Sequence, residues 1–131
     1  MSVLSKSNED YLEAIYELAG EENAPVRSVD IADKLGVSRP SVNNALAVLK
    51  KERMVVQEPY GVVSLTCQGR LLGQSIYSRH TTLLAFLNEV LGVPLEVAER
   101  EACEIEHTIS EDTVRRWRDF TTAQIELLER K

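Results

Sequence analysis

The chain has 131 residues and 44% hydrophobic content, which suits one soluble domain or two small subdomains that share a core. Its formal net charge of −6 argues against a generally basic nucleic-acid binder, and no apolar run approaches the roughly 20 residues of a membrane span. The first residues lack the apolar core of a signal peptide, so the sequence predicts a cytoplasmic protein without a membrane partner. Two cysteines in that compartment are expected to be thiols.

The first third of the chain predicts two helices. Apolar residues at helical spacing indicate a helix from Ser7 to Ala19, with Ser7 as its N-cap and Gly20 as its end. A shorter helix is predicted from Ser28 to Leu35, and Gly36 supplies the tight turn that follows.

A longer helix and a hairpin are predicted next. Ser38 caps the helix, and Pro40 is tolerated in its first turn. The β-rich runs Met54–Gln57 and Gly61–Leu65 are joined by the turn sequence Glu58–Gly61, and together they indicate a hairpin. The buried stripe of the helix is expected to contain Val42, Ala45, Leu46 and Leu49.

The second half predicts three more helices. Thr66 is the expected cap of a long helix that Gly92 and Pro94 bring to an end. The next helix is predicted from Leu95 to Ile109, and Ser110 is the expected start of the last one.

The order helix, short helix, glycine turn, longer helix and hairpin is that of a winged helix-turn-helix. The alternative is a plain helical hairpin with a β-ribbon. The segment from Ser38 to Arg53 has four basic residues and one acidic residue, a net charge of +3 inside an acidic chain. This concentration of positive charge on the longer helix favours the DNA-binding interpretation.

Residues early on the longer helix are the expected readers of base edges, and Arg39 is suited to guanine. Lys50 and Lys51 lie late on the helix and are expected to contact phosphate or solvent. Tyr60, at the predicted wing tip, could touch the DNA backbone or pack the turn. The predicted DNA-binding residues are Ser38, Arg39, Ser41, Asn43, Asn44 and Lys51.

The run Cys103-Glu104-Ile105-Glu106-His107 carries the main chemical signal. On a helix, Cys103, Glu106 and His107 share one face, with Cβ atoms about 5–6 Å apart. A thiolate, a carboxylate and an imidazole together form part of a site for a divalent metal. Glu104 points off this face and is expected to be solvated. The alternative is that the cysteine is buried and the acids lie on a solvated helix face.

Further ligands are needed from elsewhere in the chain. Asp10 and Glu13 repeat the i, i+3 spacing near the N-terminus, and His80 is the only other histidine. Each has a simpler explanation, because Asp10 could be a first-turn acid favouring the helix dipole and His80 an ordinary surface or core histidine. A metal bound by all of them would tie together three segments far apart in sequence.

The chain resembles the iron- and manganese-dependent repressors typified by the diphtheria toxin repressor and the manganese transport regulator. The matching stretches are Glu9–Tyr16, the helix-turn-helix through Met54, Arg79-His80 and Glu101–Ser110, in the family's order. The resemblance implies a homodimer that binds double-stranded operator DNA when loaded with Fe(II) or Mn(II), and that represses metal-uptake genes. Co(II) or Zn(II) would substitute in vitro.

The resemblance also implies ligand roles. Asp10 and Glu13 match the manganese type, Cys103 matches the iron type, and His80, Glu106 and His107 match both. Two ancillary ligand positions of the iron type fall on Leu84 and Glu99, so that second site looks altered or absent. The chain stops before the optional C-terminal SH3-like domain of the family.

We therefore predict a mainly α protein, with a winged helix-turn-helix DNA-binding domain at 1–66 and a helical metal-binding and dimerisation domain at 67–131. Metal would bridge the first helix to the second domain and favour the operator-binding dimer. One alternative is a winged-helix regulator that needs no metal. A small metalloenzyme is the other, but Glu104 is poorly placed as a base and the helix-turn-helix would go unexplained. We do not expect an enzyme.

Overall fold

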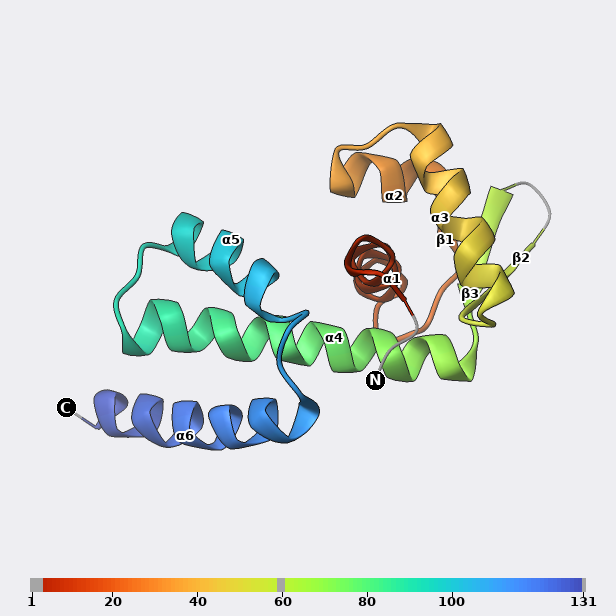
Figure 1. Cartoon of the computed structure of the whole chain (residues 1–131). Helices are drawn as coiled ribbons and strands as arrows, with labels where there is room; N and C mark the ends of the chain where they lie inside the picture. The colour runs from red at the N-terminus through yellow and green to blue at the C-terminus, as the bar shows by residue number, and fades with distance from the viewer. Residues whose placement is uncertain (1–3, 59–60, 131) are drawn as a thin grey trace. The chain divides into compact units, whose positions relative to one another are not determined.

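The computed structural model describes residues 4–58 and 61–130 (Figure 1). The chain divides into two compact units, an N-terminal unit that ends at Tyr77 and a C-terminal unit that begins at Ser78. The boundary falls inside α4 (Cys67–Ala85), the helix drawn in green in Figure 1. Among the described residues, none of the helices combines the length and the apolar character that crossing a membrane requires.

The first helix, α1 (Lys6–Ala19), begins one residue earlier than predicted. Ser5, not Ser7, is its N-cap, because Ser5 has extended backbone and its hydroxyl accepts the N–H of Asn8 at 3.1 Å. Gly20 ends the helix with φ +66°, as predicted, since a residue without a Cβ adopts that conformation without strain.

The helix-turn-helix prediction is confirmed by α2 (Ser28–Leu35) and α3 (Arg39–Lys51). Gly36 lies between them in the left-handed conformation, and its N–H donates to the carbonyl of Ala32. Ser38 caps α3 by accepting the N–H of Ser41. The predicted stripe is buried, since Val42, Ala45, Leu46 and Leu49 are each at most 4% exposed.

The wing is a three-stranded antiparallel sheet with the order β1-β3-β2. Strands β2 (Val55–Gln57) and β3 (Val62–Leu65) form the predicted hairpin, with Val55 opposite Leu65. The sequence did not indicate β1 (Val26–Arg27), which pairs with β3. Residues 59–60 of the predicted turn, including Tyr60, lie outside the described residues.

One hydrophobic core lies within the N-terminal unit and includes the first part of α4. Thr66 caps α4 as predicted, with its hydroxyl accepting the N–H of Gly69 at 3.0 Å. Gly73 packs so closely on α1 that an added Cβ would lie 2.9 Å from Cβ of Tyr16. The most completely buried side chains of this core are Leu12, Ile15, Ile31, Val42, Leu49, Val63 and Ile76.

The C-terminal unit is helical. After α4 the chain continues as the π-helix η2 (Phe86–Val90), so the predicted long helix changes hydrogen-bond pattern before Gly92. Helix α5 (Leu95–Ile105) ends four residues before the predicted Ile109. Helix α6 (Glu111–Glu129) is capped by Ser110 as predicted.

The core of the C-terminal unit includes Leu83 and Val114, both nearly inaccessible to solvent. Phe86 packs its ring against those of Trp117 and Phe120 of α6. Phe120 remains 52% exposed despite this contact. The mainly α architecture with an N-terminal winged helix-turn-helix is confirmed.

Candidate metal centre and nucleic-acid interface

The predicted metal motif lies where α5 ends, in the C-terminal unit. Helix α5 includes Cys103, whereas Glu106 is the C-cap and His107 follows it, so the prediction that all three lie on one helix is wrong for the last two. The helix stops early because Thr108 turns back and donates both its N–H and its hydroxyl to the carbonyl of Ile105. Glu106 keeps helical backbone angles, φ −58° and ψ −24°, so the shared face survives. One ligand atom from each of Cys103, Glu106 and His107 lies within 4.8 Å of the other two.

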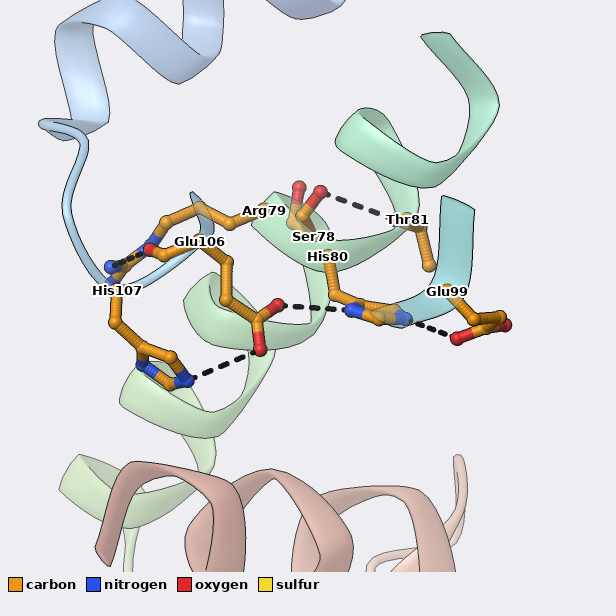
Figure 2. A network of polar contacts seen from close by, with 7 residues as sticks. All are labelled: Ser78, Arg79, His80, Thr81, Glu99, Glu106 and His107. Carbon is orange, nitrogen blue, oxygen red and sulfur yellow. Dashed lines mark hydrogen bonds and ion pairs between the residues drawn. The ribbon is translucent and has the colours of Figure 1, made fainter. Parts of the chain in front are cut away.

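Glu106 is the centre of this cluster. Its side chain is 0% exposed, and its carboxylate lies between two imidazoles (Figure 2). Oε2 is 3.1 Å from Nδ1 of His80, and Oε1 is 3.4 Å from Nε2 of His107. Arg79 donates from Nη1 to the backbone carbonyl of Glu106 at 3.2 Å, which fixes the end of α5 against α4. This role of Arg79 was not predicted from the sequence.

The residues of this cluster fit a divalent metal. Both carboxylate oxygens of Glu106 are buried, and neither accepts a hydrogen bond from the residues that the structure describes. Such a carboxylate is costly to bury unless a cation compensates it. A thiol, a carboxylate and imidazoles are the donors that first-row divalent metals take in proteins.

His80 lies on α4 and has a second acidic neighbour. Its Nε2 is hydrogen bonded to Oε2 of Glu99 at 2.9 Å, on the ring edge opposite Glu106 (Figure 2). In the sequence analysis, Glu99 was noted only because it occupies an ancillary ligand position of the iron-type repressors. A signal was present, because Glu99 precedes Cys103 by four residues and therefore continues the same face of α5.

The other two predicted ligands, Asp10 and Glu13, belong to α1 of the N-terminal unit. They lie one turn apart, and Glu13 is buried at 9% exposure. Glu104 is exposed, as predicted. The roles of all six predicted ligands stay predictions from the sequence.

The predicted DNA-binding residues lie on the solvent-facing side of α3. Arg39, Asn43, Asn44 and Lys51 are exposed, opposite the buried stripe. The hydroxyls of Ser38 and Ser41 lie 2.9 Å apart and form the start of the helix. Their exposed oxygens are still open to an additional hydrogen bond.

The end of α3 is tied to the wing. Lys50 donates from Nζ to Oε1 of Gln57 in β2 at 3.0 Å. The N–H of Met54 donates to the carbonyl of Leu49, so the chain enters β2 directly from the end of the helix. The basic end of α3 and the sheet therefore form one exposed surface of the N-terminal unit.

Comparisons with known proteins cover both units. Residues 3–63 match the family model described as iron dependent repressor, N-terminal DNA binding domain. Residues 66–123 match the iron dependent repressor, metal binding and dimerisation domain.

An uncharacterized HTH-type transcriptional regulator of Methanocaldococcus jannaschii is 35% identical over 117 residues, which are 89% of this chain and 94% of the relative. The transcriptional regulator MntR of Escherichia coli is 40% identical over 113 residues, 86% of this chain and 72% of MntR. Among solved structures, that of the manganese regulator SloR superposes with a TM-score of 0.76 at 33% identity, over 88% of this chain. The chain spans about half the length of SloR, 53%.

Proposed function

The chain belongs to the iron-dependent repressor family, and on that premise we propose that it is a metal-activated, homodimeric repressor that binds double-stranded operator DNA. The observation that supports this most directly is the buried Glu106 carboxylate between His80 and His107, in the same chain as a winged helix-turn-helix. The activating ion is Fe(II) or Mn(II), and the regulated genes serve metal uptake or homeostasis. Operator binding requires the protein to be in the cytoplasm.

In this proposal the C-terminal unit holds the metal through Cys103, Glu106, His107 and His80. When bound, the ion supplies the positive charge that the buried carboxylate of Glu106 lacks. Asp10 and Glu13 complete the ligand set, a role that comes from the sequence resemblance. The thiol of Cys103 widens the range of ions toward softer ones, so Co(II) and Zn(II) also bind in vitro.

The DNA-binding role is assigned to the exposed face of α3. Arg39, in the first turn, is the proposed reader of guanine, with Asn43 and Asn44 in the following turn suited to adenine. Ser38 and Ser41 are proposed contacts at the start of the helix, and Lys51 a proposed phosphate contact at its end.

Metal and operator are coupled in this mechanism because both act on one equilibrium. Ligands supplied by α1 as well as by the C-terminal unit make the arrangement of the two units depend on the ion. Metal then favours the dimer in which two α3 helices are spaced by about one DNA turn, ~34–36 Å. Such coupling is typically worth about 1–3 kcal/mol.

We also propose the division into a DNA-binding domain at 1–66 and a metal-binding and dimerisation domain at 67–131. The two family models, which end at residue 63 and begin at residue 66, support it. The family consists of DNA-binding transcriptional regulators and not of enzymes, so the metalloenzyme alternative has no support. The Glu106 carboxylate is buried and accepts no hydrogen bond from the described residues, which disfavours the metal-independent alternative.

The test is to select operator sequences and to measure the affinity of the protein for them at defined metal concentrations, under anaerobic conditions. Sequences selected from a random DNA pool by the Mn(II)-loaded protein should bind at least several-fold more weakly when a chelator replaces the metal. An equal affinity in Mn(II), Fe(II) and chelator would reject metal activation. Analytical ultracentrifugation of the same samples tests the dimer, since a monomer on a two-fold site would reject that part of the proposal.

A further inference from the structure

His80 is held between two carboxylates that differ in environment. Its Nε2 hydrogen bonds to Oε2 of Glu99 at 2.9 Å, and its Nδ1 lies 3.1 Å from Oε2 of Glu106 (Figure 2). The Glu99 side chain is 52% exposed, whereas the Glu106 side chain is fully buried. One ring edge therefore faces solvent-exposed acid, and the other faces the cluster of candidate ligands.

The hydrogen bond to Glu99 favours a proton on Nε2 of His80, and the longer contact of Nδ1 with the Glu106 carboxylate competes for that proton. An ionised carboxylate only accepts hydrogen bonds, so Nε2 of His80 must be the donor. In the neutral imidazole the lone pair is then on Nδ1, the atom that lies beside Glu106. A metal ligand needs that lone pair, and the orientation of the ring already directs it toward the buried carboxylate.

We propose that Glu99 is a positioning residue for the metal centre: its carboxylate holds His80 in the Nε2–H tautomer and aims Nδ1 at the ion beside Glu106. This inference rests on the proposed metal site and adds a residue to it. A carboxylate behind a ligating histidine fixes the ring, sets the tautomer and increases the basicity of the ligand nitrogen.

The rival role for Glu99 is that of a ligand to a separate ion shared with Nε2 of His80. Two observations favour positioning. The position one turn after His80 on α4 is Leu84, which has no ligand atom to offer. Among the described residues, the groups whose donor atoms converge closely enough for a metal include His80 and Glu106 but not Glu99.

The first experiment reads the tautomer in the metal-free full-length protein. Long-range ¹H–¹⁵N correlation spectra of the His80 ring are recorded through a pH titration that extends until the imidazole is neutral. Wild type should show a protonated Nε2 and an unprotonated Nδ1. Glu99→Ala should give a tautomer mixture, and Glu99→Gln, whose amide oxygen still accepts a hydrogen bond, should keep the wild-type tautomer. A protonated Nδ1 in wild type would overturn the proposal.

The second experiment measures Mn(II) binding by titration calorimetry, with binding stoichiometry recorded. Glu99→Ala should lower the affinity for the Mn(II) ion bound by His80 by about 10–100-fold without changing the number of ions bound. Glu99→Gln should recover most of the lost affinity. Glu101→Ala is the matched control, because Glu101 is an exposed acid on the same helix, and it should bind as wild type does.

Three results count against positioning. Unchanged affinity in Glu99→Ala would do so, as would an equal loss in Glu101→Ala, which indicates a general charge effect. The loss of one whole ion with the remaining affinity intact would make Glu99 a ligand. Thermal unfolding of each metal-free variant verifies that it is folded. The tautomer is measured without metal or DNA, so its result does not depend on whether the protein is a metal-activated repressor. The positioning role of Glu99 and the proposed function can therefore be rejected independently.

Discussion

Gly69, in the first turn of α4, lies directly against the backbone carbonyl of Met54, the residue that leads into β2. A Cβ at position 69 would overlap that oxygen, which also accepts the N–H of Thr66. Gly69→Ala should therefore destabilise the protein by about 1–3 kcal/mol, although alanine favours helices, because the backbone must shift. Urea unfolding measures the change. Gln68→Ala, at the exposed neighbouring position, is the control, and a stabilised Gly69→Ala would contradict the packing.

Replacing Glu106 with glutamine separates two effects of this residue: the loss of stability caused by burying its charge, and its contribution to metal binding. Glu106→Gln keeps the shape of the side chain and should leave the metal-free protein at least as stable as wild type, because an uncompensated buried carboxylate is lost. The stabilisation by Mn(II), about 2.7 kcal/mol at 100 times Kd in wild type, should fall sharply. Thermal unfolding with and without Mn(II) gives both quantities. Glu104→Gln, on an exposed residue of the same segment, should respond as wild type does, and a comparable loss there would place the ligands on the wrong face.

The two cysteines, neither in a disulfide, provide a spectroscopic test of the proposed thiol ligand. Cys103 lies in the cluster of candidate ligands, and Cys67 is exposed at the start of α4. The protein loaded with Co(II) should show a sulfur-to-metal charge-transfer absorption, because Co(II) binds a thiolate. Cys103→Ser should abolish this absorption and Cys67→Ser should preserve it. The reverse pattern would remove Cys103 from the ligand set.

An acidic side chain at the same position tests metal preference. Cys103→Glu replaces the soft thiolate with a hard oxygen donor, so Mn(II) binding should be retained while affinity for Zn(II) and Co(II) falls relative to Mn(II). Competition titrations against a chromophoric chelator measure the three affinities. Loss of binding for every ion would mean that the site cannot exchange this ligand.

Arg39 and Lys51, at opposite ends of α3, should differ in how they affect DNA binding. Arg39→Ala should cost about 1–3 kcal/mol on the selected operator and relax preference at one base pair in each half-site. Lys51→Ala should weaken binding about equally on all sequences and lower the slope of affinity against salt concentration. Arg100→Ala, on the exposed side of α5, is the control. Equal footprints for all three variants and wild type would place the DNA-binding surface elsewhere.

Local chemistry made most of the helix boundaries predictable. Ser38, Thr66 and Ser110 each accept a backbone N–H three residues on, which a sequence pattern can indicate because the interaction spans a single turn. Ser5 and Ser7 are both reasonable caps by this criterion, and the chain uses Ser5. Buried positions of α3 followed from periodicity for the same reason.

Features that depend on distant partners were not predictable in this way. Strand β1 has two residues and no periodicity of its own, and it exists because Val26 pairs with Val63. The hydrogen bond from His80 to Glu99 joins residues 19 positions apart on separate helices. The clustering of Cys103, Glu106 and His107 was predictable from i, i+3, i+4 spacing even though α5 ends at Ile105, because Glu106 continues in helical conformation for one more residue.

The tie between Lys50 and Gln57 has a consequence for the entropy of DNA binding. Together with the backbone hydrogen bond from Met54 to Leu49, it restricts the long lysine side chain and the neighbouring strand before any DNA arrives. An immobilised rotamer-rich side chain costs about 0.5–1.5 kcal/mol when it is ordered on association. Part of that cost is met when the chain folds, so in the proposed complex the end of α3 and strand β2 are partly ordered in advance.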